Sequence, residues 1–193
     1  MAEIEMPPPL IETKRLLLTW PTPEQIAGHY AAIVGTNIFD TIVWDGPSDV
    51  QELHDWWSET ASRSPSDVGL SLNMAVIERT SGRYIGGVSL RPVDGDPAVI
   101  DIGYAFAVDS HGKGYATEAV GALVDEAFGK RGAERIFGNV FVGNVGSRRV
   151  MEKLGFVHEG TQRRCACKRG VWRDQWMIAI TRPDWESRQA GRS

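Results

Sequence analysis

The sequence contains little cysteine and no long apolar segment. Only two of its 193 residues are cysteines, Cys165 and Cys167, and a pair this close rarely forms a structural disulfide. A zinc site would need further ligands at a set spacing, and none lies nearby in the chain. No apolar run approaches the roughly 20 residues that span a bilayer, and residues 1–9 lack the basic start and apolar middle of a signal peptide. We therefore expect a cytoplasmic protein that has no metal ion and does not contact a membrane.

Two well-known phosphate-binding motifs are missing as well. The P-loop pattern G-x-x-x-x-G-K-[ST] occurs nowhere in the chain. The dinucleotide pattern G-x-G-x-x-G starts at Gly112 and Gly114 but fails at Thr117, and no βαβ unit with an acidic ribose partner is evident. The sequence therefore favours neither a P-loop nucleotide site nor a Rossmann-type dinucleotide site.

Charge is unevenly distributed along the chain. Residues 1–129 hold 7 Lys and Arg against 19 Asp and Glu, whereas residues 130–173 hold 11 Lys and Arg against 3 Asp and Glu. A basic block is a feature of nucleic-acid-binding proteins, but it suits a small polyanionic cofactor equally well. The acidic remainder of the chain argues against non-specific nucleic-acid binding by the whole domain, so we expect no nucleic-acid partner.

What the chain does contain is a glycine-rich turn between a predicted strand and a predicted helix, within residues 100–120. Gly112 and Gly114 let the backbone approach a ligand closely, because glycine has no Cβ and tolerates a positive φ. The helix that follows directs its free N–H groups and the positive end of its dipole at the turn. Such a site suits phosphate, so the sequence predicts binding of a phosphorylated small molecule.

The turn has the form His111-x-x-Gly114-x-Ala116. It resembles the pyrophosphate loop of the GNAT superfamily of acetyl-CoA-dependent N-acetyltransferases, which is written Q/R-x-x-G-x-G/A. His111 departs from the usual Gln or Arg, and the departure is mild because the resemblance implies that backbone amides do most of the binding. Further segments resemble the RimJ/RimL branch of that superfamily, in the right order along the chain: residues 10–18, 114–119, Asn144-x-x-Ser147, 152–156 and 159–160.

Apolar periodicity, capping signals and turn residues predict about seven strands and four helices. The strands are expected at residues 15–20, 72–78, 84–91, 98–107, 136–142, 156–164 and 171–181, and the helices at 23–34, from a capping box at Ser48-x-x-Gln51 to 60, from the glycine turn to 128, and at 147–154. The resemblance implies a GNAT-type α/β fold. Its central sheet would be mixed and mostly antiparallel, splayed between the fourth and fifth strands, with helices on both faces. We expect residues 1–9 to form a flexible arm, residues 10–183 a single acetyltransferase domain, and residues 184–193 a C-terminal tail.

The resemblance also implies acetyl-CoA as the cosubstrate, with its pantetheine between the two splayed strands. A backbone N–H on the fourth strand, that of Phe106 or a neighbour, would polarise the acetyl carbonyl. The residues expected to contact the cosubstrate are Phe106, Ala107, Val108, His111, Gly112, Lys113, Gly114, Tyr115, Ala116, Thr117, Asn144 and Ser147.

Many members of the superfamily protonate the departing thiolate with a tyrosine, but the matching position here is Met151. The RimJ/RimL branch instead uses Asn-x-x-Ser, which implies that Ser147 donates a hydrogen bond to the sulfur and that Asn144 binds the pantetheine amides. Helix capping is the alternative for both residues, because Asn and Ser are favoured at helix N-termini.

The general base is left open by the sequence. Asp101, on the strand beside the splay, matches an acidic residue found before Gly-Tyr in this branch, and it is the first candidate. Asp174 is the second and Glu159 the third, and a chain of waters leading to solvent is a further alternative.

Together these features predict an N-acetyltransferase that moves an acetyl group from acetyl-CoA to a primary amine by direct attack in a ternary complex. The acceptor would be a protein N-terminus or a small amine, and the protein a monomer or a homodimer. The alternative is a non-catalytic module that binds or senses acyl-CoA on the same fold. Asp101 together with the pair Asn144 and Ser147 favours catalysis.

Overall fold

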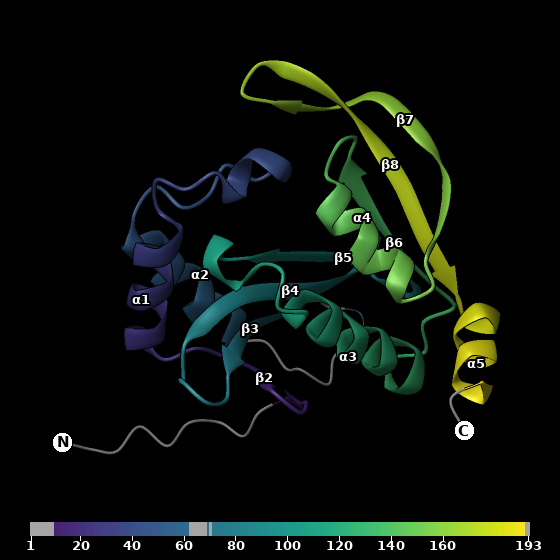
Figure 1. The fold of residues 1–193 in the computed structure, drawn as a ribbon, viewed down its shortest axis with the longest axis horizontal. Helices are drawn as coiled ribbons and strands as arrows, with labels where there is room; N and C mark the ends of the chain where they lie inside the picture. Colours follow the sequence, from purple (N-terminus) through teal and green to yellow (C-terminus); the bar gives the residue numbers. More distant parts are fainter. Residues whose placement is uncertain (1–9, 62–68, 70, 192–193) are drawn as a thin grey trace.

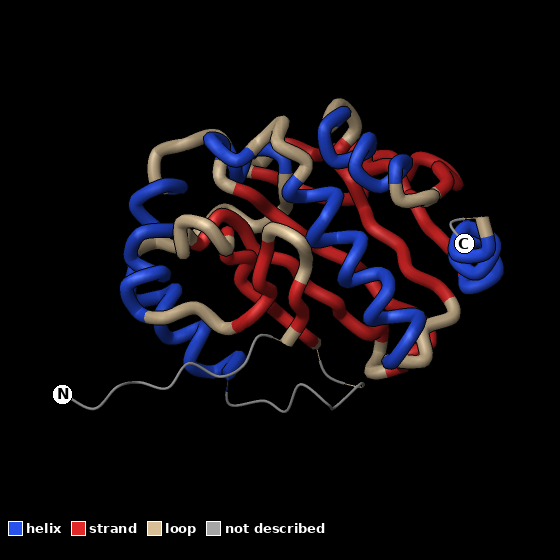
Figure 2. The backbone as a smooth tube through the Cα atoms, turned by 60° about the horizontal axis from the view of Figure 1, so that its bottom comes forward, coloured by secondary structure: helices blue, strands red, loops and turns tan. Residues whose placement is uncertain are grey.

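The computed structural model describes residues 10–61, 69 and 71–191. These residues form one open sheet with helices packed against it (Figures 1 and 2). The strands are β1 Ile11–Glu12, β2 Leu16–Thr19, β3 Leu72–Glu78, β4 Tyr84–Val93, β5 Asp96–Phe106, β6 Arg135–Phe141, β7 Val157–Lys168 and β8 Val171–Thr181. The helices are α1 Pro23–Ile33, α2 Val50–Ala61, α3 Tyr115–Lys130, α4 Val145–Lys153 and α5 Arg182–Ala190, with short 3-10 turns η1 at Ile38–Thr41 and η2 at Val108–Ser110.

The sheet has the strand order β1-β2-β3-β4-β5-β6-β8-β7. All neighbouring strands run antiparallel except β5 and β6, which are parallel. The pairing of β5 with β6 spans only Val99–Asp101 on β5, although β5 continues to Phe106 and β6 continues past the paired residues. The strands therefore separate beyond Asp101. This confirms the predicted mixed, mostly antiparallel sheet and its splay between the fourth and fifth strands of the sequence prediction, which are β5 and β6.

Helices cover both faces of the sheet. On one face, α3 buries Val120, Leu123 and Phe128 against a core that includes Ile102 of β5 and Ile136 of β6. On the other face, α1 and α2 bury a second cluster, in which Ile26, Leu53 and Trp57 pack on Ala75, Ile77 and Tyr84. Within the described residues, no helix has both the length and the apolar character that a membrane crossing requires.

Local signals explain where the first helices begin. Thr22 accepts a hydrogen bond from the N–H of Gln25, and the Gln25 side chain accepts one from the N–H of Thr22, which forms a capping box. The cap predicted at Ser48 is wrong by one residue. The N–H of Glu52 donates to the side chain of Asp49, while the Glu52 carboxylate accepts from the backbone and hydroxyl of Ser48. Asp and Ser are equally good caps. The sequence therefore does not decide between Ser48 and Asp49, and the geometry of the loop does.

A fifth helix occupies residues that the sequence analysis assigned to a tail. α5 starts at the cap Thr181, whose hydroxyl and N–H both bond the carboxylate of Asp184. Trp185 of α5 stacks on Phe128 with 5.4 Å between ring centroids, and its indole N–H donates to Asp125 at 2.7 Å. α5 therefore covers the C-terminal half of α3. The extent of the arm at residues 1–9, which lies outside the described residues, stays a prediction.

Candidate active site

The predicted phosphate turn forms the N-terminus of α3. Gly112 and Gly114 both have positive φ, of 75° and 79°, and Gly114 is the N-cap. The first intrahelical donor is Glu118, whose N–H bonds the Gly114 carbonyl at 3.1 Å, so the amides of the three residues before it have no partner inside the helix. Residues 111–114 are exposed. The turn thus presents free amides, a helix dipole and the Lys113 side chain to solvent, which suits an anion.

Contacts from outside the turn hold it in place. Arg15 of the β1–β2 connection donates to the Lys113 carbonyl at 3.0 Å and forms an ion pair with Glu118 at 2.6 Å. Its guanidinium also lies over the ring of Tyr115, 4.6 Å from the centroid. The His111 ring approaches the Phe106 carbonyl at 2.9 Å through Nε2. His111 therefore fixes the turn to the end of β5.

The end of β5 turns one set of backbone groups towards the splay. The N–H of Ala107 donates to the carbonyl of Ile85 on β4 at 2.9 Å. Because backbone groups of successive strand residues point to opposite edges, the N–H groups of Phe106 and Tyr104 point towards β6, which has diverged there. The Phe106 ring is buried and packs over Gly86, where an added Cβ would lie 2.5 Å from that ring. The side chain of Phe106 thus belongs to the core, while its amide faces the splay.

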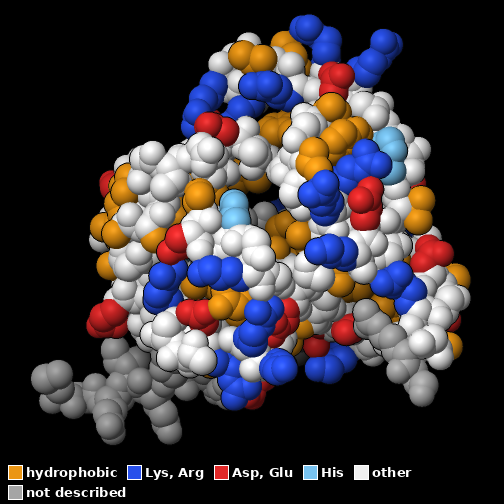
Figure 3. Space-filling model, in the orientation of Figure 1, with side chains coloured by type: hydrophobic (Ala, Val, Ile, Leu, Met, Phe, Trp, Pro, Cys, Tyr) orange, Lys and Arg blue, Asp and Glu red, His pale blue; other side chains and the backbone are white. Residues whose placement is uncertain are grey.

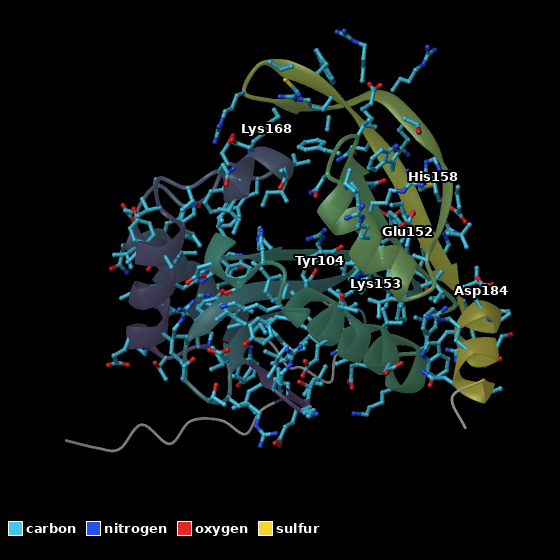
Figure 4. All side chains as sticks on the ribbon, viewed as in Figure 1. Tyr104, Glu152, Lys153, His158, Lys168 and Asp184 are labelled. Atoms are coloured by element: carbon cyan, nitrogen blue, oxygen red, sulfur yellow. The ribbon has the colours of Figure 1, made fainter. Side chains whose placement is uncertain are left out.

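Ser147 and Tyr104 meet across the splay. The hydroxyl of Tyr104 on β5, labelled in Figure 4, lies 2.8 Å from Oγ of Ser147 in the first turn of α4 and 3.0 Å from the Ser147 carbonyl. Burial raises the pKa of Tyr104 to about 12. Asn144 is the N-cap of α4, because its Oδ1 accepts from the Ser147 N–H at 3.1 Å. The capping interpretation of Asn144 is thus present in the geometry. Tyr104 is the residue that the sequence analysis missed.

Met151 lies at the α4 position that matches the tyrosine of many members of the superfamily. Its side chain is 1% exposed and packs on Gly138 of β6, where an added Cβ would come within 2.4 Å of the methionine Cε. A glycine on the strand thus makes room for the methionine. Met151 belongs to the core between α4 and β6, and its side chain has no proton to donate.

The three carboxylates considered as bases are all engaged. Asp101 is paired with Arg91 of β4 at 2.7 Å, on the face of β5 opposite to Tyr104, since the two differ by an odd number of residues. Asp174 accepts from the backbone N–H of Arg164 at 2.8 Å. The ion pair with Arg135 holds the pKa of Glu159 below its usual range. Asp101 is therefore the candidate nearest the splay. Asp174 connects β8 to β7, and Glu159 connects β7 to β6.

A loop and a hairpin contact each other through Lys168. Lys168 at the end of β7 is 4% exposed, and its ammonium donates to the carbonyls of Val43 and Trp44 at 3.2 and 2.7 Å and pairs with Asp45 at 2.6 Å. The β7–β8 hairpin thereby reaches over to the loop that follows η1 (Figures 1 and 4). Figure 3 shows a hollow in the face of the molecule that is viewed there, with apolar side chains inside it.

The aromatic and thiol side chains near this region differ in their surroundings. Trp57 is buried in the core, whereas Trp44 is half-exposed and stands edge-on to Phe39, 5.3 Å between centroids. Cys165 and Cys167 are exposed free thiols on β7. Among the described residues, no group of three or more His, Cys, Asp or Glu is placed to hold a metal ion.

Comparison with known proteins identifies the family. The acetyltransferase (GNAT) domain matches residues 15–157, which is more than half of the chain, and the chain belongs to this family. It is 39% identical over 115 residues to a probable N-acetyltransferase, YjcK, of Bacillus subtilis, an alignment that covers 59% of this chain and 64% of that protein. The chain thus spans just under two thirds of the length of this relative.

Two further comparisons agree with the RimJ/RimL-like branch. The chain is 29% identical over 134 residues to a putative ribosomal N-acetyltransferase, YdaF, of Bacillus subtilis, which covers 69% of each protein. The structure of Mycobacterium smegmatis RimJ in complex with CoA-disulfide superposes with a TM-score of 0.74 at 23% identity, covering 86% of this chain and 81% of that one. The predicted resemblance to the GNAT superfamily is confirmed by the family match. The likeness to a putative ribosomal N-acetyltransferase agrees with the RimJ/RimL-like branch, and the likeness to RimJ shows a shared fold.

Proposed function

We propose that the protein is an acetyl-CoA-dependent N-acetyltransferase that moves an acetyl group to a primary amine by direct attack in a ternary complex. The observation that carries the proposal is the alignment of three features: the free amides at the start of α3, the strand edge of β5 facing the splay, and the Ser147 hydroxyl beyond it. The residues fit the cosubstrate, because the anion site is exposed and the splay leaves strand amides without a neighbouring strand.

Each part of this arrangement has a separate task. The amides of residues 115–117, with Lys113, would hold the pyrophosphate of acetyl-CoA. An amide of β5, that of Phe106 or its neighbour Tyr104, would donate to the acetyl carbonyl and stabilise the oxyanion that forms there. Ser147 would donate a hydrogen bond to the departing sulfur. When bound, acetyl-CoA supplies the activated acetyl thioester.

The reach of Asp101 depends on which β5 amide holds the carbonyl. A strand advances roughly 3.3 Å per residue, so Asp101 lies about 10 Å along β5 from Tyr104 and about 17 Å from Phe106. A base must approach its proton to hydrogen-bond distance or through one water. We infer that Asp101 acts as the base, through water, only with the acetyl carbonyl near Tyr104. A water chain replaces it if the carbonyl lies near Phe106.

The acceptor we propose is a protein N-terminus or a small amine. The first is supported by one relative, a putative ribosomal N-acetyltransferase. The acidic N-terminal two thirds of the chain favours a cationic acceptor. The protein would act in the cytoplasm as a monomer or a homodimer.

A second candidate function is a non-catalytic module that binds acyl-CoA. Two observations favour it: Met151 stands in place of the family tyrosine, and the Asp101 carboxylate is paired with Arg91. The two functions share the cosubstrate site and differ only in turnover.

A screen of amines and N-terminal peptides with acetyl-CoA separates the two functions. The readouts are release of free thiol and acetylation of the acceptor by mass spectrometry. We expect thiol release that depends on the acceptor and matches the acetylated product mole for mole. Tight acetyl-CoA binding without acceptor-dependent release over the whole panel would leave the binding module as the function.

A further inference from the structure

The side chain of Tyr104 connects the two walls of the splay. It projects from β5 on the same face as Ile102 and Phe106, and its hydroxyl contacts both the Oγ and the carbonyl of Ser147 on α4. The strands β5 and β6 are not paired at this level, so the contact bridges a gap that no ladder hydrogen bond closes. The position of this contact therefore depends on Tyr104 and Ser147 and not on strand pairing.

We propose that Tyr104 is a positioning residue for acetyl transfer, which orients the Ser147 hydroxyl so that its proton points at the sulfur of the cosubstrate. The inference rests on the proposed function and on the assigned role of Ser147. Tyr104 and Ser147 would together take the place of the tyrosine that Met151 replaces. Tyr104 acts through Ser147, so its effect should disappear when Ser147 is removed.

The hydroxyls of Tyr104 and Ser147 can donate their hydrogen bonds in two different ways. Tyr104 has one phenolic proton and two acceptors, the Ser147 carbonyl at 3.0 Å and Oγ at 2.8 Å. With the phenol donating to the carbonyl, the Ser147 hydroxyl can donate to the phenol oxygen, and its proton is then not available to the sulfur. With the phenol donating to Oγ, the serine proton is free for another acceptor. A negative sulfur favours the second state, because hydrogen bonds in a chain strengthen one another.

The backbone of Ser147 is fixed independently of its hydroxyl. Asn144 accepts from the Ser147 N–H at 3.1 Å and so sets the first turn of α4. The remaining freedom is rotation of the serine side chain, which Tyr104 restricts. No proton is lost from either hydroxyl in this step. The C–N bond to the acceptor forms as the C–S bond breaks, the amine proton passes to the base or to water, and the sulfur takes the electron pair of the broken bond. The thiolate later takes its proton from solvent. Burial keeps the phenol protonated.

The test is a double-mutant cycle with Tyr104→Phe, Ser147→Ala and the double variant, measured as kcat and KM for acetyl-CoA. Each single change should lower kcat by about tenfold, the value of one lost hydrogen bond in the transition state, with KM changed by less than about twofold. The double variant should be no slower than Ser147→Ala alone. Tyr30→Phe is the matched control, because Tyr30 packs on the other face of the sheet, and its kcat should equal that of the wild type. Effects of Tyr104→Phe and Ser147→Ala that multiply would overturn the proposal.

A second measurement does not depend on turnover. In the complex with CoA, the hydrogen bond from Ser147, oriented by Tyr104, should lower the pKa of the bound thiol. This pKa is read from the thiolate absorbance after the absorbance of the free protein is subtracted. We expect this pKa to rise by about one unit in Tyr104→Phe and by the same amount in Ser147→Ala. An unchanged thiol pKa in Tyr104→Phe would overturn the inference even where no acceptor is acetylated. A shifted thiol pKa with no acetylation of any amine would overturn the proposed function and leave the orientation of Ser147 intact.

Discussion

Arg91 and Asp101 lie directly opposite each other on β4 and β5, and two nitrogens of Arg91 donate to one oxygen of Asp101, Nε at 3.1 Å and Nη2 at 2.7 Å to Oδ2. The pair lies at the level where β5 and β6 stop pairing. The guanidinium takes up the Oδ2 atom, so any exchange of protons with an acceptor has to use Oδ1.

We predict that Asp101→Asn lowers kcat/KM at neutral pH by about a hundredfold, the scale of general-base catalysis, with little loss of stability. Arg91→Gln is the matched control, because it removes the guanidinium and keeps the carboxylate. The measurement is the pH dependence of kcat/KM. The acidic limb should vanish or move in Asp101→Asn and persist in Arg91→Gln. A wild-type rate with an unchanged acidic limb in Asp101→Asn would assign the proton transfer to water.

The two roles of Asn144 can be separated by two substitutions. Asn144→Ala removes the α4 cap and should lower the free energy of unfolding by about 1 kcal/mol. Asn144→Asp keeps an oxygen for the Ser147 N–H but loses the amide that donates to the Thr41 carbonyl at 3.4 Å. If Asn144 also binds pantetheine, Asn144→Asp should be as stable as the wild type and still bind acetyl-CoA more weakly. Urea denaturation and calorimetry give the two quantities, and wild-type affinity in Asn144→Asp would leave capping as its whole role.

The stability of the protein should decrease between neutral pH and pH 4 because of His29. Burial lowers the pKa of His29 from 6.5 to about 4, against the opposing hydrogen bond to the Tyr84 carbonyl at 3.1 Å. The unfolded chain therefore binds the proton at a pH where the folded chain does not, so stability is full above pH 6.5 and is lost as the pH falls towards 4. At about pH 5 the loss from this group is about 2 kcal/mol.

Urea unfolding of the wild type and His29→Gln at neutral pH and near pH 5 measures this contribution. The stability of the variant at neutral pH is its own reference, and the expected result is a shallower pH dependence than that of the wild type. Equal pH dependence in both proteins would show that the imidazole does not titrate in this range.

Lys168 should control the loop that follows η1. Lys168→Met keeps the apolar length of the side chain and removes three contacts, to Val43, Trp44 and Asp45. We expect faster amide exchange and faster proteolysis across residues 38–47. The KM for the acceptor should rise by roughly fivefold, because the acceptor then has to order the loop when it binds. The affinity for acetyl-CoA should stay unchanged, since none of these three Lys168 contacts is with the turn at residues 111–116. Unaltered exchange in the loop would show that the hairpin does not hold it.

Local patterns were enough to predict most of the elements. Thr22 with Pro23, and the glycine turn before Tyr115, mark helix starts through short-range chemistry. The α5 helix carried the same signal, Thr181-x-Pro183-Asp184, and was missed although its cap follows the same rule as that of α1. The boundaries of β5 and β6 could also be predicted, because apolar alternation and turns delimit them.

The contacts that build the site could not be predicted in the same way. Tyr104 and Ser147 lie 43 positions apart, and Lys168 and Val43 lie 125 apart. Such contacts depend on the angle of the splay and on the reach of a hairpin, which local sequence does not encode. The pairing of Arg91 with Asp101 depends on strand register, since a slip of one residue would send the two side chains to opposite faces.

The turn before α3 provides the most direct test of acetyl-CoA binding. Gly114→Asp introduces a negative charge at the anion site while the new Cβ would lie 3.5 Å from the Arg15 guanidinium, which can hold the added carboxylate. Gly132→Asp is the matched control, because Gly132 has a similar φ of 73° just beyond the other end of α3 and open space around it. Calorimetric titration with acetyl-CoA should show affinity lowered by about tenfold or more in Gly114→Asp and wild-type affinity in Gly132→Asp. Wild-type affinity in a folded Gly114→Asp variant would contradict the assignment of acetyl-CoA to this turn.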